Sequence, residues 1–372
     1  MSNAGLRKAK HQEIFDALLQ DIETGRYRGG EQLPTEHSLV KRFNASRPTV
    51  SRAVQSLVQM GLVHRRAGSG TFVRQGAVNG RRVFGLLVPE LGDSEIFEPI
   101  CGHIARQIQR LGHALQWADS NPNSNHRQTA ETAADACRGF VDRGVAGVFL
   151  APFVTPPGTD NPNETIVETL RKAGIAVVLL DRDIVQFPQR SDLDLVGVDH
   201  VRGQARMTEY LIKSNHRRFG YWVWENVADT VQNRSAGILR ALTAAGIPID
   251  PQMIQPCDPT DRVQVTRLMK SQKPDAIMCA NDVFAAHLMR TLEEMDIRVP
   301  EDVSVVGYDD VLYSHLFRVP LTTISQPCEK IGNAAAQLML ERIAHPELPP
   351  REVLITPSLS IRESTTSRDD SN

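Results

Sequence analysis

Charged and amide side chains follow several apolar segments of the sequence, at positions where short strands are expected to end. Asp119, Asp181 and Arg182 follow two such segments, and Asn281 and Asp309 follow two others farther along the chain. Carboxylates and Asn exchange hydrogen bonds with adjacent hydroxyl groups, and the fork of an Arg side chain holds two oxygens at once. This chemistry suits a neutral ligand with several hydroxyl groups. The alternative is that Asp and Asn only cap the helices that begin after the strands.

A second group of candidate residues is basic and lies near the amino terminus. From Arg7 to Arg82 the chain has 14 basic and six acidic residues, whereas the net charge of the whole chain is −2. The remainder of the chain is therefore acidic. Such an asymmetry favours a basic module that binds a polyanion, joined to an acidic body. The alternative is a basic face that only meets solvent.

The spacing of residues in this basic segment predicts three helices and a hairpin. Apolar residues recur at helical spacing over residues 14–22, and Thr35 and Ser46 are candidate N-caps of a second and a third helix. The short break at Asn44 separates these two helices, as helix-turn-helix geometry requires. Residues 62–73 then predict two strands around a Gly-rich turn.

Four segments of this region resemble the GntR family of winged-helix regulators. They are residues 30–36 (GEQLPTE), 46–50 (SRPTV), 61–63 (GLV) and 68–73 (GSGTFV). The resemblance implies that Arg47 and Thr49 contact bases or phosphates. It also implies that the wing glycine, Gly68, enters the minor groove.

Two departures from the family pattern suggest that the operator sequence differs from the common one. They are at His37, where the family usually has Arg, and at Ser51, which is followed by Arg52. Lys41 and Arg42, together with the wing cations, are expected to meet phosphates. The expected DNA contacts are His37, Ser46, Arg47, Thr49, Ser51, Arg52, Arg65, Arg66 and Gly68.

Beyond a polar linker at residues 76–81, apolar runs alternate with helical stretches. This alternation implies parallel sheets that are covered by helices on both faces. The predicted strands are residues 83–88, 114–117, 147–150, 175–180, 195–198, 219–224, 276–279 and 303–306. The region is large for one sheet, and we expect two halves that divide around residues 186–194. Ligands of such folds bind beyond the carboxyl ends of the strands.

The same region resembles the effector domain of the LacI family. The segments that carry the resemblance are residues 199–203 (DHVRG), 215–218 (NHRR), 234–237 (RSAG), 280–282 (AND), 299–310 (VPEDVSVVGYDD) and 321–327 (LTTISQP). The resemblance implies a periplasmic-binding-protein-like fold, a homodimer and an effector in the cleft between two subdomains. One of Trp222 and Trp224 is expected to face the cleft and stack on a sugar ring. With the strand-end residues, the expected effector contacts are Phe97, Asp119, Asp181, Arg182, Trp224, Arg234, Asn281, Asp309 and Gln326.

The expected fold class is therefore α/β, with an N-terminal winged helix-turn-helix and a two-subdomain periplasmic-binding-protein-like domain with parallel sheets. The expected domains are residues 1–75, the linker, residues 82–363, and a disordered tail at residues 364–372. This pairing resembles the bacterial arabinose repressors. It implies a repressor that binds a pseudo-palindromic double-stranded DNA operator as a homodimer, with a small carbohydrate, preferably arabinose-like, as effector. The alternatives are a nucleoside, a uronate or another metabolite as effector, or a DNA-binding protein without a ligand.

Composition and motifs argue against several other classes. Hydrophobic residues at 41% and charged residues at 23% exclude wholesale disorder. No stretch approaches the roughly 18 apolar residues of a membrane span, and the polar amino terminus does not resemble a secretory signal. Five scattered cysteines without a CxxC motif indicate reduced thiols in the cytoplasm. Nucleophile-elbow, HExxH, P-loop and dinucleotide motifs are absent, so we expect no enzyme, no cofactor and no metal.

Overall fold

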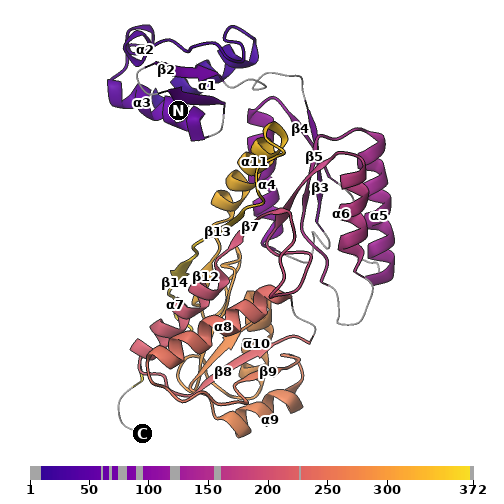
Figure 1. The fold of residues 1–372 in the computed structure, drawn as a ribbon. Coiled ribbons are helices and arrows are strands. Elements are labelled where there is room, and N and C mark those ends of the chain that lie inside the picture. The colour runs from indigo at the N-terminus through magenta and orange to yellow at the C-terminus, as the bar shows by residue number, and fades with distance from the viewer. Residues whose placement is uncertain are drawn as a thin grey trace, which may run out of the picture.

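A computed structural model of the chain describes residues 10–59, 62–66, 69–73, 82–88, 95–117, 126–154, 161–225 and 228–368. Three bodies lie in a row: a small N-terminal domain, a first α/β subdomain and a second α/β subdomain at the far end (Figure 1). The two large sheets are parallel throughout. The predicted fold class is confirmed.

Three helices and a hairpin make up the N-terminal domain. They are α1 (Lys10–Glu23), α2 (Glu36–Phe43), α3 (Arg47–Gln59), β1 (Val63–Arg66) and β2 (Gly70–Val73). The two strands are antiparallel, with Val63 opposite Val73, and Gln32 forms a further bridge to Phe72. The inward faces of the helices and of the hairpin share one apolar core. This arrangement is a winged helix-turn-helix.

Local signals in the sequence set the ends of the second and third helices. The Thr35 side chain accepts a hydrogen bond from the Ser38 backbone nitrogen at 3.2 Å, and Asn44 ends α2 with a φ of 45°. Ser46 Oγ accepts a hydrogen bond from the Thr49 backbone nitrogen at 3.4 Å, at the start of α3. Asn tolerates the left-handed region better than most residues. The predicted caps and the predicted break between the helices are confirmed.

A six-stranded parallel sheet with the order β13-β7-β6-β5-β3-β4 forms the first subdomain. Its elements are β3 (Val83–Leu87), α4 (Phe97–Arg110), β4 (Ala114–Trp117), α5 (His126–Asp142), β5 (Gly147–Leu150), α6 (Pro162–Lys172), β6 (Ala176–Leu180), β7 (Asp194–Val198), α11 (Cys328–Ala344) and β13 (Glu352–Ile355). Helices α4 and α11 cover one face of the sheet, and α5 and α6 cover the other (Figure 1). The central strands are buried on both faces, which explains their nearly continuous apolar sequence.

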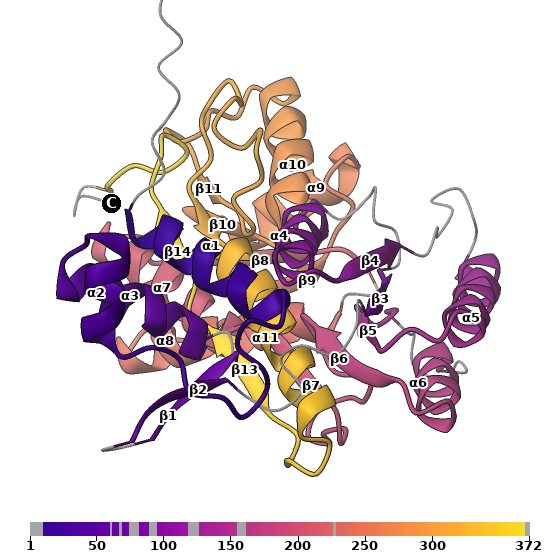
Figure 2. The ribbon, with the colours of Figure 1, turned by 90° about the horizontal axis from the view of Figure 1, so that it is seen from above.

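A four-stranded parallel sheet with the order β11-β10-β8-β9 forms the second subdomain. Its elements are α7 (His200–Lys213), β8 (Phe219–Val223), α8 (Asp229–Ala244), β9 (Ile254–Pro256), α9 (Arg262–Gln272), β10 (Ala276–Cys279), α10 (Asp282–Glu294) and β11 (Ser304–Val306). Helices α7 and α8 pack together on one face, and α9 and α10 lie on the other (Figure 2). A short pair, β12 (Thr323–Ser325) and β14 (Ser358–Ser360), lies between the subdomains (Figure 1).

Within the described residues, the chain passes between the subdomains after β7, between β12 and α11, and between β13 and β14. The predicted division around residues 186–194 is wrong. This stretch joins β6 to β7, and β7 pairs with both β6 and β13 in the first sheet. Its polar residues and Pro188 mark a surface loop within a subdomain and not a boundary between two.

The predicted disorder of residues 364–372 is wrong for residues 364–368. Ser364 is fully buried, and its hydroxyl donates a hydrogen bond to the Val305 carbonyl at 2.6 Å. The same oxygen accepts a hydrogen bond from the Thr322 backbone nitrogen at 2.8 Å. The polar composition of the tail suggested solvation, but its hydroxyl serves as a partner for buried backbone groups of the second subdomain.

Three further predictions concern membrane spans, the cysteines and the linker. No helix in the described part of the chain is long and apolar enough to cross a membrane. All five cysteines are free thiols, as predicted. The predicted linker at residues 76–81 lies outside the described residues.

Candidate functional site

The first turn of α3 presents polar side chains to solvent. The hydroxyls of Ser46 and Thr49 are 2.7 Å apart and hydrogen-bonded to each other. The Arg47 side chain between them is 83% exposed. The backbone N–H groups at a helix N-terminus attract negative charge. This turn can therefore meet the phosphates and base edges of a duplex.

A groove of about 790 Å³ lies between the start of α2, the helix α3 and the hairpin. Five of the predicted DNA contacts line it: His37, Arg47, Ser51, Arg65 and Arg66. The Glu36 carboxylate is 2.9 Å from Arg65 Nη2 and 3.7 Å from Arg47 Nε. Since one carboxylate contacts both guanidinium groups, Glu36 sets the spacing of two exposed cations that come from different elements.

The remaining basic residues of the N-terminal domain fall into two groups. Lys41 and Arg52 are exposed. Arg42 is instead paired with Asp21 at 2.5 Å, and this hydrogen bond raises the pKa of the guanidinium. Arg42 therefore ties α2 to α1 and is less available to a phosphate than we expected. Gly68 lies outside the described residues.

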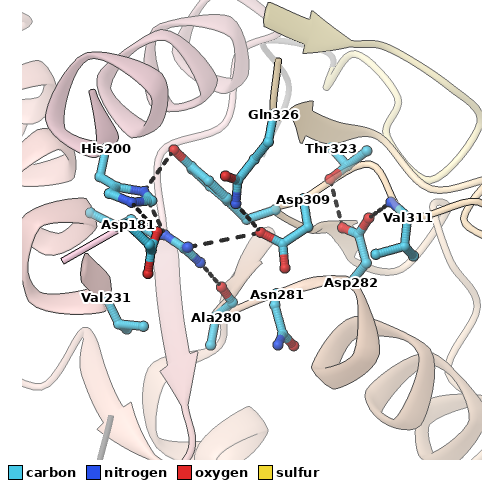
Figure 3. Close-up of polar contacts among 12 residues, drawn as sticks. Asp181, His200, Val231, Ala280, Asn281, Asp282, Asp309, Val311, Thr323 and Gln326 are labelled. Atoms are coloured by element: carbon cyan, nitrogen blue, oxygen red, sulfur yellow. Dashed lines mark hydrogen bonds and ion pairs between the residues drawn. The ribbon is translucent and has the colours of Figure 1, made fainter. Parts of the chain in front are cut away.

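In the body of the protein, several predicted effector contacts meet where the two subdomains face each other (Figure 3). Arg234, on α8, is only 5% exposed and lies at the centre. Its Nη1 donates to the Ala280 carbonyl, and its Nε donates to Nδ1 of His200 at 3.3 Å. Its guanidinium carbon lies 3.7 Å from the centroid of the Tyr308 ring. An Arg held by three neighbours keeps its remaining donor directions fixed.

Asp309 faces this guanidinium from the end of β11. Its Oδ1 is 3.8 Å from Arg234 Nη2 and accepts a hydrogen bond from Gln326 Nε2 at 2.7 Å. Burial raises the pKa of Asp309 to about 6, although the charge of Arg234 and the hydrogen bond from Gln326 oppose the rise. The backbone of Asp309 has a φ of 121°. Non-glycine residues rarely adopt this conformation, and the surroundings must hold it in place.

Asp282, at the start of α10, supplies part of that support. Its Oδ2 accepts a hydrogen bond from the Val311 backbone nitrogen at 3.0 Å, and its Oδ1 accepts one from Thr323 Oγ1 at 2.6 Å. Burial holds the pKa of Asp282 well above its usual range, and the negative charge of Asp309 raises it further. This carboxyl links α10, the turn after Asp309 and β12, so it fixes the position of Asp309.

Asp181 reaches the same network from the end of β6 in the first subdomain. Its Oδ1 lies 3.4 Å from Nε2 of His200, whose Nδ1 is 3.1 Å from the Tyr308 hydroxyl. Since Nδ1 accepts a hydrogen bond from Arg234, the proton of the neutral ring is on Nε2, toward Asp181. Burial opposes the ionisation of Asp181, but the His200 ring beside it and the charges of Arg182 and Arg234 outweigh this effect and lower its pKa to about 2. Burial lowers the pKa of His200.

Besides Nε2 of His200, which faces Asp181 at 3.4 Å without forming a hydrogen bond, two buried polar atoms of this network have no hydrogen-bond partner among the described residues. They are Nε of Arg182 and Oε1 of Gln326. The Arg182 nitrogen lies 3.6 Å from the Asp181 carboxylate, which is too long for a hydrogen bond. A buried group without a partner costs about 1–3 kcal/mol. Hydroxyl groups of a ligand would supply both missing partners.

Asn281 and the two tryptophans lie nearby, at the ends of β10 and β8. Asn281 Oδ1 accepts a hydrogen bond from the Phe284 backbone nitrogen at 2.8 Å and so caps α10. Trp224 is partly buried, with its ring edge-on to Phe284 at 5.0 Å. Trp222 is fully buried in the core of the second subdomain. Asn281 thus has the capping role that we weighed as the alternative, and Trp224 keeps an exposed edge.

Phe97, another predicted contact, does not join the network. Phe97 is 3% exposed and packs in the core of the first subdomain, and Asp119 lies outside the described residues. Conversely, sequence reasoning did not assign His200, Tyr308 or Asp282. Each lies within a segment that carries the family resemblance, and that position is the signal that could have found them.

Comparisons with known proteins match both parts of the chain. Residues 10–73 match the family of bacterial regulatory proteins, gntR family, and residues 208–365 match the periplasmic binding protein-like domain. The chain is 25% identical, over 96% of its length and 97% of the relative's, to an arabinose metabolism transcriptional repressor of Geobacillus stearothermophilus. It is 29% identical, over 90% of both chains, to the protein of that name from Halalkalibacterium halodurans.

A solved structure extends the likeness to the fold. A LacI family transcriptional regulator from Enterococcus faecium, with bound ribose, is 25% identical and superposes with a TM-score of 0.63. The match covers 77% of this chain and all of that one. The chain therefore joins a gntR-type DNA-binding domain to a periplasmic-binding-protein-like domain, the domain pair of a transcription regulator. Its relatives are regulators and not enzymes.

Proposed function

We propose that the protein is a homodimeric transcription repressor, which binds a pseudo-palindromic operator through its winged helices and is controlled by a small neutral sugar in the cleft. The observation that carries the proposal is the polar network between the subdomains, with its two unpartnered buried atoms. A pentose similar to arabinose is the favoured effector. Since an operator-binding regulator acts where the DNA lies, we place the protein in the cytoplasm.

The charges of the cleft support a neutral ligand. Asp181 and Asp309 are carboxylates at neutral pH, and Arg182 and Arg234 are cations, so the four side chains balance. Carboxylates accept hydrogen bonds from sugar hydroxyls, and guanidinium groups donate to sugar oxygens. A charged ligand such as a uronate would add a negative charge that no cation of the cleft is left to balance. Trp224 offers an apolar edge beside this polar set.

The names of the relatives support a five-carbon sugar in particular. Two relatives are named for arabinose metabolism, and the similar solved structure holds ribose. Arabinose and ribose are both pentoses and differ only in the configuration of their hydroxyl-bearing carbons. We therefore expect a pentose to satisfy Arg182, Gln326 and the Asp309 carboxylate together.

The DNA side of the proposal rests on the exposed surface of α3 and on the groove beside it. Ser46, Arg47 and Thr49 would approach base edges, whereas Arg65 and Arg66 of the hairpin would meet phosphates. Two half-sites about one helical turn apart demand a fixed separation of the two winged helices. Closure of the cleft on a sugar would change that separation and release the operator.

A thermal-shift screen of the full chain tests the cleft assignment. Saturating pentose should stabilise the wild-type protein, by about 2.7 kcal/mol at a concentration 100 times the dissociation constant. Arg234→Ala and Asp309→Asn should abolish the shift. Arg290→Ala, which removes an 80% exposed guanidinium from a surface pair with Glu294, should retain it. A sugar that stabilises all four proteins equally would contradict the site, and stabilisation by nucleosides alone would contradict the pentose.

A further inference from the structure

Helices α4 and α11 both begin where the two subdomains face each other and end beside the DNA-binding domain (Figure 1). Helix α11 begins two residues after Gln326, and its 17 residues span about 25 Å. Helix α4 begins two residues after Glu95, and its 14 residues span about 20 Å. The two helices therefore connect the regions that an allosteric protein must couple.

At the cleft, each helix is preceded by a residue that is tied to the second subdomain. The Gln326 side chain donates to Asp309, and its backbone nitrogen donates to the Asp309 carbonyl at 3.4 Å. Tyr313 lies in the loop after β11, and its pKa is raised by burial and further by the neighbouring Glu95 carboxylate, so the two side chains interact. A shift of the second subdomain relative to the first must therefore move both residues.

Between their ends, α4 and α11 pack too closely to slide independently. A Cβ atom on Gly332 of α11 would lie 2.6 Å from His103 Cβ, 2.8 Å from the Ile100 carbonyl and 3.1 Å from the Ile104 nitrogen of α4. The contact is thus backbone against backbone, with no flexible side chain to absorb a displacement. Close-packed interiors of this kind transmit movement.

At the far end, the two helices contact the DNA-binding domain directly. Leu111, which caps α4, belongs to the apolar core of that domain, and Leu340 of α11 packs against the same core. Phe15 of α1 lies on the other side of this contact. We call the contact of Phe15 with Leu111 and Leu340 the seam.

The seam is incompletely packed. A cavity of about 270 Å³ lies in it, lined from the DNA-binding domain by Gln12, Phe15 and Ser56, and from the body by α4 and α11. Gln107 lines the same cavity, and its buried Oε1 has no partner among the described residues. A contact with an empty volume and an unpartnered amide is held weakly, so its geometry can respond to a small movement of the helices.

We propose that α4 and α11 move as one rigid element that carries the state of the cleft to the DNA-binding domain through the seam. The segment that packs on the ends of α4 and α11 is helix α1 of this same chain. The inference rests on the proposed function for the identity of the ligand, but the seam itself can be tested without a ligand. An element that both sites bias is the physical requirement for coupling between them.

Hydrogen exchange of residues 10–23 in the full chain tests the seam without a sugar. The double variant Leu111→Ala/Leu340→Ala should exchange about tenfold faster in α1 than the wild type. Leu354→Ala, which truncates a 47% exposed leucine outside the apolar clusters of the first subdomain, should leave α1 unchanged. Gln107→Leu replaces the unpartnered amide with an apolar group and should slow the exchange. Exchange of α1 that is the same in all four proteins overturns the proposal, whatever the protein binds.

The coupling is tested with L-arabinose and D-ribose on DNA that the wild-type protein selects from a random pool. A pentose that shifts the thermal midpoint of the wild type should also change its DNA affinity about tenfold or more. In the seam double variant the thermal shift should persist, and the change in DNA affinity should fall below about threefold. A full change in DNA affinity in that variant overturns the proposal. If no pentose shifts the thermal midpoint of the wild type, the proposed function fails. The exchange experiment alone then tests whether the seam is a real contact.

Discussion

The Asp309→Asn substitution should change how the stability of the protein depends on pH. Asn keeps the shape of the side chain and can still accept the hydrogen bond from Gln326, but it cannot ionise. In the wild type, burial raises the pKa of Asp309 from 3.8 to about 6. A carboxyl with a raised pKa stabilises the fold fully below its unfolded pKa, and this stabilisation is lost as the pH rises through the folded pKa.

The size of the effect follows from the two pKa values. A rise of about two units corresponds to about 3 kcal/mol over the whole titration. Between about pH 5 and pH 7.5 the unfolded carboxyl is already ionised, so about 1.4 kcal/mol of the loss falls in this window. The Asn variant is spared this loss. Its stability relative to the wild type should therefore rise with pH, by about 3 °C in thermal midpoint over the window.

The assay is thermal unfolding followed by tryptophan fluorescence, since Trp222 and Trp224 lie in the same subdomain as Asp309. The difference in midpoint between variant and wild type is measured at each pH, so other titrating groups cancel. Asp302→Asn is the control, because the hydrogen bonds from Arg298 lower the pKa of Asp302 to about 2, and the carboxyl is ionised throughout the window. A midpoint difference for Asp309→Asn that stays constant from about pH 5 to pH 7.5 would refute the reasoning.

Substitutions at Asp282, Gly332 and Arg47 test the packing and the DNA surface. Asp282→Asn should keep the thermal midpoint near that of the wild type, because an amide can serve both partners, whereas Asp282→Leu should cost about 2 kcal/mol or more by leaving two buried donors unpaired. Gly332→Ala should destabilise the protein by about 1–3 kcal/mol in chemical denaturation because it forces α4 and α11 apart. Gly102→Ala, on the open side of α4, is the control and should be neutral or stabilising. Equal losses of stability in the two variants would contradict the close packing of α4 against α11. Arg47→Ala should weaken binding to the selected DNA by about 1–3 kcal/mol and relax the sequence preference of the protein. A loss of affinity that is the same for all DNA sequences would instead make Arg47 a phosphate contact.

Three residues of the polar network could be predicted from the positions of strand ends in the sequence. Asp181, Arg182 and Asp309 were found because apolar runs mark buried parallel strands, and the residues after them must gather at one edge of the sheet. Arg234 and Gln326 came only from the family resemblance. The network therefore mixes residues that periodicity predicts with residues that only a resemblance can place.

His200 was missed for a physical reason. It follows the end of β7 directly, at the point where the chain crosses to the second subdomain. The position of that crossing depends on which strands pair, and β7 pairs with β13, a strand about 150 residues away that the sequence did not predict. The predicted crossing at residues 186–194 lies before β7 and not after it, whereas the side chains of His200 and Asp181 are 3.4 Å apart.

Short strands and the ordered tail were missed because long-range contacts decide them. Strands β12 and β14 have three residues each and form by pairing with each other, with a further bridge from Ser325 of β12 to Asp309. Ser364 is polar and near the end of the chain, and its burial depends on backbone groups of residues 305 and 322. Local composition carries no information about such partners.

The central claim is that a sugar in the cleft controls the affinity for DNA. The measurement that tests it most directly is a fluorescence-anisotropy titration of DNA selected by the full chain, with and without millimolar L-arabinose or D-ribose, for the wild type and for Arg234→Ala. We predict that one pentose weakens DNA binding by the wild type about tenfold or more and leaves binding by Arg234→Ala unchanged. DNA affinity of the wild type that is the same with every pentose and without it would contradict the claim.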